Sequence, residues 1–296
     1  MSDNPKRLFV FGNLKGGTGK TECALTLITA LDGLGVDVEY GEVDEVRRLS
    51  EVLSEKKAPL VSLKTAPEEV SGFAIEQLQE LMNPLVRLVE QDVSVLDLGA
   101  NIPDRFIEWA ESSMLKDVAD MEGTRLTFVS VTTSDGNSIY PGLKFIRQAW
   151  DLFGNDADYA IISNDISGGG NIDLRTNSVT ADEIAEIEGY IKNLATINIP
   201  NCPPTKSISF ARNSFISIYE LLEMIEKTRE KVIAGENIDV PFTRAIDLNA
   251  HPSKAEKKLY LNQQLIHVKK WIKAAHEAMI EGLDLETLKE ARERAA

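Results

Sequence analysis

The chain has 296 residues, of which 43% are hydrophobic and 27% are charged, a composition typical of a globular protein. Its formal net charge is -15, so DNA binding would require a local basic patch. Two cysteines, Cys23 and Cys202, exclude a disulfide framework, and no apolar run reaches the roughly 20 residues that span a bilayer. The N-terminal residues also lack the apolar core of a secretion signal, so we expect a cytoplasmic protein.

The first predicted elements are a strand, a glycine-rich loop and a helix. Residues 8–11 form an apolar run that stops at Gly12, which predicts a short buried strand. From Lys20 to Leu34 apolar residues recur at helical spacing as far as Gly35, a typical C-cap residue. This order is that of the start of a parallel βαβ unit.

The alternation of strands and helices continues to residue 200. A capping box of Thr180 and Glu183 opens the last helix of this series. The pattern predicts strands at 36–44, 93–97, 125–133, 158–165 and 195–200, helices at 71–91 (bent or broken at Pro84), 106–121, 142–153 and 180–194, and a flexible segment at 167–171. The predicted fold class is therefore α/β, a mostly parallel sheet with helices on both faces.

The C-terminal part of the chain is expected to be helical. One helix is predicted at 213–233, and a polar connector follows Gly235. A long helix at 254–282 and a short charged helix then complete the chain. We expect one α/β domain over residues 1–235 and a C-terminal helical extension over 236–296 that packs on the core.

The segment GGTGKT at residues 16–21 indicates phosphate binding. Its glycines let the backbone curl with N–H groups inward at a helix N-terminus. Lys20 is expected to reach the β- and γ-phosphates, and Thr21 to place its hydroxyl on Mg²⁺. The alternative is a glycine-rich turn with an incidental lysine, although the flanking strand and helix favour a nucleotide site. The predicted nucleotide contacts are Gly16, Gly17, Thr18, Gly19, Lys20, Thr21 and Glu22.

A second lysine, Lys15, precedes the glycines. The strict phosphate-loop pattern requires glycine where Leu14 stands, and the segment instead reads K-G-G-x-G-K-T. With this deviant Walker A motif, about residues 7–226 resemble the ParA/MinD family of ATPases. The resemblance implies an ATP- and Mg²⁺-dependent sandwich dimer in which Lys15 touches the phosphates of the partner subunit. A second cation there could offset charge on the phosphoryl oxygens, and the alternative is a solvated loop lysine.

The acidic segment GEVDE at 41–45 falls where the family has its first switch. The resemblance implies that Asp44 lies near Mg²⁺ and helps to orient the attacking water. Glu42 replaces an aspartate of the family pattern, which leaves its role open. The alternative for both residues is an acidic strand end that faces solvent.

A second acidic position follows the apolar run in VSVLDLGAN, residues 93–101. By the resemblance this is a Walker B strand, in which Asp97 holds the metal through a water. Gly99 could let the backbone approach the γ-phosphate, and Asp-x-Gly-Ala resembles family members of plasmid stability and conjugative transfer more than the cell-division branch. The alternative for Asp97 is a strand-ending turn.

Two further positions match the base-binding residues of the family. Asn164 ends a strand where an asparagine hydrogen-bonds the adenine edge, and Pro200 ends the next strand where a proline packs near the base. Asparagine is also a common turn residue after a strand, so both interpretations stay open.

The histidines and cysteines indicate no metal site. The three histidines lie in the C-terminal part without metal-ligand spacing, and we expect surface or packing roles for them. Cys23 and Cys202 do not match the arrangement by which the related nitrogenase iron proteins hold an iron–sulfur cluster.

Partition ATPases of this family bind DNA without sequence preference, and lysines of the predicted long helix are the candidate contacts. Lys269, Lys270 and Lys273 place cations within about one helical turn, and Lys206 with Arg212 forms a second candidate patch. The alternative is a solvated helix face whose lysine stems pack on the core.

These features predict a dimerising ParA-like ATPase for plasmid partition or cargo positioning, in which slow, partner-stimulated hydrolysis resets the dimer. One alternative is an accessory ATPase of conjugation or plasmid stability with little DNA affinity. Another is a metabolic P-loop enzyme of the same superfamily, which needs no second lysine. A membrane-riding ATPase is disfavoured because residues 283–296 are too few and too charged to insert. Expected partners are a second copy, an activator or adaptor protein and non-specific DNA, with nucleoid association if DNA binds.

Overall fold

The structure of the protein is a computed structural model. The structure describes residues 6–53, 57–65, 67–133, 136–164, 185, 189, 191, 194–200, 205–214, 216–236, 240–251 and 253–295. The chain divides into two compact units, unit 1 with residues 1–199 and 276–296 and unit 2 with residues 200–275. The domain boundary expected after residue 235 stays a prediction.

Unit 1 is built on one parallel sheet. The strands of its described part are β1 (Lys6–Gly12), β2 (Glu39–Val43), β3 (Val61–Leu63), β4 (Val93–Leu98), β5 (Thr124–Thr132), β6 (Ala157–Asn164) and β7 (Leu194–Ile199). Their order across the sheet is β3-β2-β4-β1-β5-β6-β7, and every described pair is parallel. The predicted parallel sheet is therefore confirmed, and the carboxyl ends of all these strands lie at one edge.

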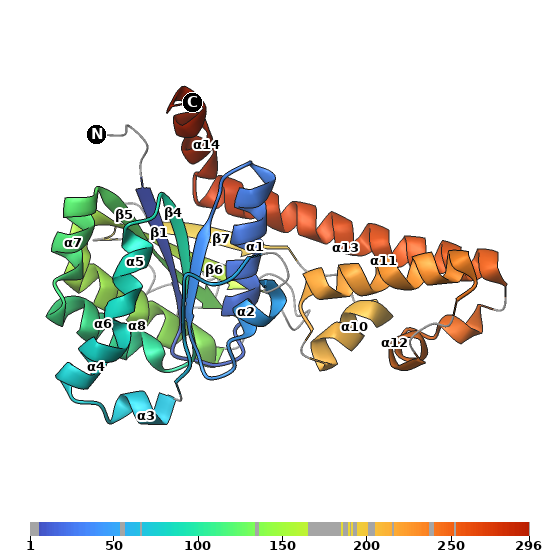
Figure 1. Ribbon diagram of the computed structural model, residues 1–296, viewed down its shortest axis with the longest axis horizontal. Coiled ribbons are helices and arrows are strands. Elements are labelled where there is room, and N and C mark those ends of the chain that lie inside the picture. The colour runs from blue at the N-terminus through green and yellow to red at the C-terminus, as the bar shows by residue number, and fades with distance from the viewer. Residues whose placement is uncertain are drawn as a thin grey trace. The chain divides into compact units, whose positions relative to one another are not determined.

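Helices cover both faces of this sheet. The described helices of unit 1 are α1 (Lys20–Gly33), α2 (Arg48–Leu53), α3 (Pro67–Ser71), α4 (Ile75–Met82), η1 (Asn83–Leu85), α5 (Val86–Val89), α6 (Ile102–Ser112), α7 (Leu115–Glu122), α8 (Gly136–Phe153), η2 (Gly154–Asp156) and α14 (Leu285–Ala295), together with residues 276–282 of α13 (Lys254–Gly282). In Figure 1, α1 lies on one side of the sheet and α5 to α8 lie on the other. The two-faced covering that the sequence predicted is thus observed.

The central strand β1 supplies apolar side chains to both layers. Leu8 and Val10 belong to a large buried cluster with Trp109 of α6 and Phe145 of α8. Phe9 is 0% exposed, and strand alternation directs it to the opposite face. This two-sided burial explains why the strand is a continuous apolar run, and it fixes the point at which the next loop begins.

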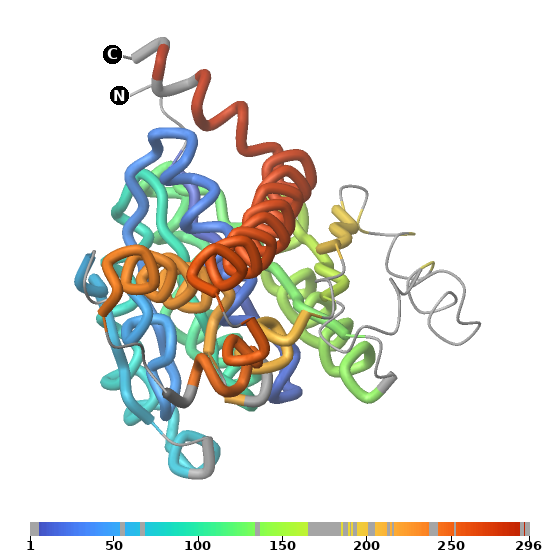
Figure 2. Tube along the Cα trace, turned by 90° about the vertical axis from the view of Figure 1, so that its right-hand side faces the viewer, coloured from blue at the N-terminus to red at the C-terminus, as the bar shows by residue number. Residues whose placement is uncertain are grey.

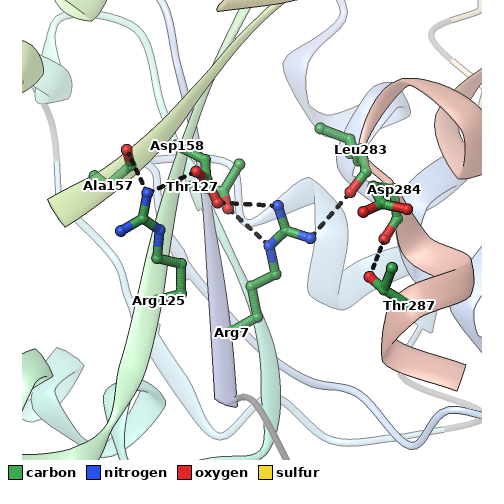
Figure 3. Close-up of polar contacts among 8 residues, drawn as sticks. All are labelled: Arg7, Arg125, Thr127, Ala157, Asp158, Leu283, Asp284 and Thr287. Atoms are coloured by element: carbon green, nitrogen blue, oxygen red, sulfur yellow. Dashed lines mark hydrogen bonds and ion pairs between the residues drawn. The ribbon is translucent and has the colours of Figure 1, made fainter. Parts of the chain in front are cut away.

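The segment between α13 and α14 is hydrogen-bonded to the sheet through a partly buried arginine of β1 (Figure 3). The guanidinium of Arg7 donates to the main-chain oxygen of Leu283 at 3.0 Å and to Thr127 Oγ1 at 3.0 Å, and it pairs with Asp158 at 3.2 Å. Arg125 holds the other oxygen of Asp158 at 2.8 Å. Figures 1 and 2 accordingly place the start of β1 and helix α14 at the same end of unit 1.

Unit 2 is helical in its described part. It contains α10 (Lys206–Asn213), α11 (Ile218–Ala234), α12 (Val240–Ala245), η3 (Leu248–Ala250) and the residues up to 275 of α13 (Lys254–Gly282). Phe210 and Phe242 pack with ring centroids 5.4 Å apart, and Ser207 donates to Gln264 at 2.8 Å. Trp271 donates to the main-chain oxygen of Pro200 at 2.6 Å.

Several predicted helices differ from those observed. The helix expected at 106–121 is two helices, because Met114 has a φ of 54° and interrupts it. The segment 71–91 is divided among α3, α4, η1 and α5, with Pro84 in the 3₁₀ turn that the sequence marked as a bend or break. Helix α11 begins at Ile218 instead of residue 213, since Ser217 and Glu220 form its capping box.

Other elements were missed or lie outside the described residues. Helix α8 begins at Gly136 instead of residue 142, and the connector after residue 235 contains α12 and η3. The short elements β3, α2 and α10 were not expected. The flexible segment predicted at 167–171 and nearly all of the helix predicted at 180–194 fall outside the described part of the chain.

Candidate functional site

The glycine-rich loop joins the end of β1 to the start of α1. Gly17 and Gly19 have φ angles of 75° and 87°, in the left-handed region that glycine adopts without strain. Helix α1 begins directly after Gly19 and has 14 residues. The first N–H groups of such a helix have no intrahelical partners, and its N-terminus favours an anion.

Lys20 and Thr21 extend from the first turn of α1 toward the end of β4. Thr21 Oγ1 donates to Asp97 Oδ2 at 2.6 Å, and Lys20 Nζ donates to the main-chain oxygen of Lys15 at 3.1 Å. Burial lowers the pKa of Lys20, and this effect is opposed by the negative charges of Asp97 and Asp44. The structure therefore brings together the lysine, the hydroxyl and the carboxylate of β4 that the sequence singled out.

Asp97 is a buried carboxylate whose charge is only partly offset. Burial is the largest effect and raises the pKa of Asp97 to about 6, although the hydrogen bond from Thr21 and the charge of Lys20 oppose it. Within the described residues, Asp97 Oδ1 and Thr18 Oγ1 are buried without a hydrogen-bond partner. A cation beside Asp97 and an anion beside Lys20 would satisfy these groups, so the residues present fit a nucleotide phosphate with Mg²⁺.

The second predicted carboxylate, Asp44, follows β2 and contacts the loop after β4. Its Oδ1 accepts from the N–H of Glu45 at 2.7 Å. A Cβ atom added to Gly99 would lie 2.7 Å from that same oxygen, and the N–H of Gly99 donates to the main-chain oxygen of Val43 at 2.8 Å. Glycine at position 99 therefore leaves room for the carboxylate, a constraint that the sequence did not reveal.

Glu42, whose role the sequence left open, is 0% exposed and bonded within the sheet layer. Its carboxylate accepts from both the N–H and the hydroxyl of Ser50 in α2, and from Ser62 Oγ in β3 at 2.9 Å. It lies opposite Asp97 in the parallel register, and its charge contributes to the raised pKa of Asp97. The described contacts make Glu42 a link between β2, β3 and α2.

Lys15, the lysine with the predicted role across a dimer, is exposed. Its main-chain N–H donates to Asn13 Oδ1 at 2.8 Å, and its main-chain oxygen accepts from Lys20. In the described part of the chain, no hydrogen bond or ion pair engages the Lys15 ammonium group. The trans role stays a prediction.

Asn13 is a residue that the sequence reasoning missed. Its side chain is buried and bonds to the loop, to β5 and to α8. The sequence did offer a signal, because Asn13 is a polar residue directly between a buried strand and a glycine-rich loop. Burial of an amide without hydrogen-bond partners costs free energy, so a polar residue at this position indicates that it has partners.

The predicted base-binding residues both have protein partners. Asn164 is buried, and its Nδ2 donates to the main-chain oxygen of Thr18 at 3.1 Å, which holds the phosphate loop. Pro200 belongs to unit 2, where its oxygen accepts from Trp271. Their contacts with adenine stay predictions.

Cys23 and His276 both lie in packed surroundings within unit 1. Cys23 is buried, and burial raises the pKa of its thiol, so the unreactive protonated form is favoured. Cys202 lies outside the described residues. His276 Nε2 lies 3.0 Å from Thr29 Oγ1, and no group of three or more His, Cys, Asp or Glu side chains that could hold a metal ion occurs in the described ranges.

The candidate DNA-binding lysines lie on α13. Lys269 pairs with Glu226 of α11 at 2.7 Å, and Lys269, Lys270 and Lys273 are all exposed. In the second candidate patch Lys206 pairs with Asp247 at 2.9 Å, and nothing is described for the side chain of Arg212. Helices of the described segments contain no stretch long and apolar enough to cross a bilayer.

Comparisons with known proteins give structural likeness at low sequence identity. No family model matches the chain, and no curated protein matches it. The MinC:MinD cell division protein complex of Aquifex aeolicus matches with 16% identity and a TM-score of 0.39, over 79% of this chain and 98% of that chain. A variant of McdA of Cyanothece in complex with ATP matches with 15% identity and a TM-score of 0.39, over 74% and 91%. Apo McdA of Cyanothece matches with 14% identity and a TM-score of 0.41, over 88% and 99%.

Proposed function

We propose that this protein is an ATPase that pairs with a second copy of itself when ATP and Mg²⁺ are bound and separates after hydrolysis. The observation that carries the proposal is the cluster at the carboxyl edge of the sheet. There Lys20, Thr21 and Asp97 converge beside a glycine loop that opens a helix. This arrangement suits a triphosphate and its metal better than a polar turn.

Each residue has a proposed task in this cycle. The glycine loop and Lys20 bind the phosphates, while Thr21 and Asp97 hold Mg²⁺, with Asp97 acting through a water. Bound Mg²⁺ would neutralise charge on the β- and γ-phosphate oxygens. Asp44 orients the attacking water from the loop after β2. Asn164 and Pro200 are retained as the proposed adenine contacts, and Glu22 as a loop-helix contact.

Lys15 supplies the link between nucleotide and dimer in this proposal. Its side chain is exposed, and no described residue forms a hydrogen bond or ion pair with its ammonium group, whereas Lys20 is 7% exposed and is held within the loop. A cation that reaches the partner's phosphates would make association depend on the triphosphate. That dependence provides the differential affinity that a switch between paired and separate states requires.

The cargo follows from the resemblance in the sequence, and we propose segregation of plasmid DNA or positioning of another complex. Hydrolysis would be slow and stimulated by an activator or adaptor protein. A second candidate is an accessory ATPase of conjugation or plasmid stability with weak DNA affinity. It is favoured by the ion pair of Lys269 with Glu226, which offsets one of the candidate DNA-binding charges.

Association of Lys15→Ala tests the proposal. Light scattering with a non-hydrolysable ATP analogue and Mg²⁺ should show a dimer for the wild type and a monomer for Lys15→Ala. Lys64→Ala is the matched control, because Lys64 is another exposed lysine of unit 1. Lys15→Ala should still bind the nucleotide, whereas Lys20→Ala should not. Unchanged association of Lys15→Ala would favour a metabolic enzyme that uses the loop within one subunit.

DNA retention separates the two candidate cargo roles. Replacement of Lys269, Lys270 and Lys273 by Glu should abolish ATP-dependent retention on DNA if these residues bind phosphate groups, and retention should fall steeply with salt. A wild-type protein that dimerises with ATP but is not retained on DNA at low salt would select the accessory role.

A further inference from the structure

The side chain of Asn13 joins three parts of unit 1 that are distant along the chain. It is 0% exposed. Its Nδ2 donates to the main-chain oxygens of Val131 at 2.7 Å and Ser138 at 2.9 Å, and its Oδ1 accepts from the N–H of Lys15 at 2.8 Å. Both donors and the acceptor oxygen of the amide are therefore engaged.

The surroundings of Asn13 are closely packed. A Cβ atom added to Gly142 of α8 would lie 2.9 Å from Asn13 Nδ2 and 2.5 Å from Ser130 Oγ. Ser138 is fixed in turn, since its Oγ accepts from the N–H of Thr133 at 2.8 Å. The first turn of α8 is thus held against the amide, and this helix cannot shift there without breaking one of these bonds.

The bond to Lys15 has a specific consequence for the position of that residue. The main chain of Lys15 is held at its N–H by Asn13 and at its oxygen by Lys20 Nζ, 3.1 Å away. Its side chain extends into solvent from this fixed point. A long flexible side chain reaches a distant target more often when its backbone is already in place.

We propose that Asn13 is a positioning residue for Lys15. It holds the backbone from which this lysine reaches the partner subunit's phosphates, and it ties that backbone to the first turn of α8. The inference rests on the proposed function, in which Lys15 acts across a dimer. All the described hydrogen bonds of the Asn13 amide are made within its own subunit, and one of them positions Lys15. Loss of this amide should therefore affect association and turnover more than nucleotide affinity.

The experiment compares Asn13→Ala with a matched control, Asn164→Ala. Asn164 is also a buried asparagine that tethers the same loop, but it bonds to Thr18 instead of Lys15. Each variant is measured alone and combined with Lys15→Ala, for affinity of one subunit for ATP, for ATP-dependent association and for the turnover number. We expect Asn13→Ala to weaken association and turnover by about tenfold or more, with ATP affinity within about threefold of the wild type.

The double variants give the decisive readout. If Asn13 acts only through Lys15, Asn13→Ala combined with Lys15→Ala should be no worse than Lys15→Ala alone. Asn164→Ala should instead lower ATP affinity and add to the effect of Lys15→Ala. Additive effects of Asn13→Ala and Lys15→Ala would overturn the inference, as would a loss of ATP affinity in Asn13→Ala equal to its loss of association.

A measurement without nucleotide tests the contact itself. Amide hydrogen exchange of the peptide that covers residues 13–19 should be faster in Asn13→Ala than in the wild type, while peptides of β4 and α6 are unchanged. Equal exchange in the loop peptide would refute the proposed hold on Lys15. If Asn13→Ala does not fold, Asn13→Ser replaces it, because a hydroxyl is too short for all three bonds but still offers a polar group to the buried carbonyls.

The outcomes distinguish the inference from the function on which it rests. Unchanged association of Lys15→Ala refutes the proposed function. Loss of association in Lys15→Ala without a matching loss in Asn13→Ala refutes only the role assigned to Asn13.

Discussion

Replacement of Asp97 by asparagine should stabilise the nucleotide-free, metal-free protein at neutral pH. Burial raises the pKa of this carboxyl from the ordinary 3.8 to about 6. The difference is roughly two pH units at about 1.4 kcal/mol each, so ionisation of Asp97 costs the folded protein about 3 kcal/mol above the raised pKa. Asparagine carries no charge, and its oxygen can still accept the hydrogen bond from Thr21.

The sign of the pH dependence follows from proton binding. Between about pH 4 and about pH 6 the folded state holds a proton on Asp97 more often than the unfolded state does, so the stabilising contribution of the protonated form is lost as pH rises through about 6. The advantage of Asp97→Asn should therefore be largest near about pH 8 and should shrink by about 2 kcal/mol by about pH 4.

Urea unfolding followed by tryptophan fluorescence, with chelator and without nucleotide, measures this difference at each pH. Titrating groups that do not interact with Asp97 contribute equally to the two proteins, so their effects cancel. Asp117→Asn is the control substitution, because it makes the same chemical change at an exposed aspartate of α7. A stability difference between the wild type and Asp97→Asn that is constant from about pH 4 to about pH 8, or a less stable Asp97→Asn at about pH 8, would refute the reasoning.

Three further predictions concern single contacts. In Gly99→Ala the added methyl group would overlap Asp44 and the main-chain oxygen of Val43. We therefore expect the free energy of unfolding in urea to fall by about 1–3 kcal/mol and ATP hydrolysis to become slower. A variant with wild-type stability and wild-type hydrolysis would show that the loops after β2 and β4 do not constrain each other. In Glu42→Gln an amide group replaces one of the two carboxylate oxygens, which together accept from Ser50 and Ser62. This change should lower the free energy of unfolding by about 1–3 kcal/mol, against less than about 1 kcal/mol for the exposed control Glu122→Gln. Equal losses would contradict the role of Glu42 as a buried hydrogen-bond acceptor. Burial lowers the pKa of His276. The stabilising contribution of its neutral form is therefore present above about pH 6.5 and is lost as pH falls. The stability of the wild type relative to His276→Gln should decrease between about pH 7 and about pH 5. A difference independent of pH in the same unfolding assay would show that His276 is not protected from protonation.

The sequence predicted the strand, glycine loop and helix because these elements depend on neighbours along the chain. The apolar run of β1 reflects burial on both faces, and glycines 17 and 19 have the left-handed backbone that a curled loop requires. The same pattern indicated that Thr21 and Asp97 would lie close together, and their side chains are hydrogen-bonded, since residues at the ends of neighbouring parallel strands share the carboxyl edge.

The tertiary structure decided which polar groups meet and which positions they constrain. The partners of Asn13 lie 118 and 125 residues away along the chain, and those of Glu42 lie 8 and 20 residues away on short elements that periodicity does not reveal. The break at Met114 likewise carries no glycine or proline signal. Local pattern specifies backbone conformation and the buried face, but a hydrogen bond between distant segments exists only once the chain is packed. The backbone of the glycine-rich loop could therefore be predicted from the sequence, whereas the residues that hold the loop in place could not.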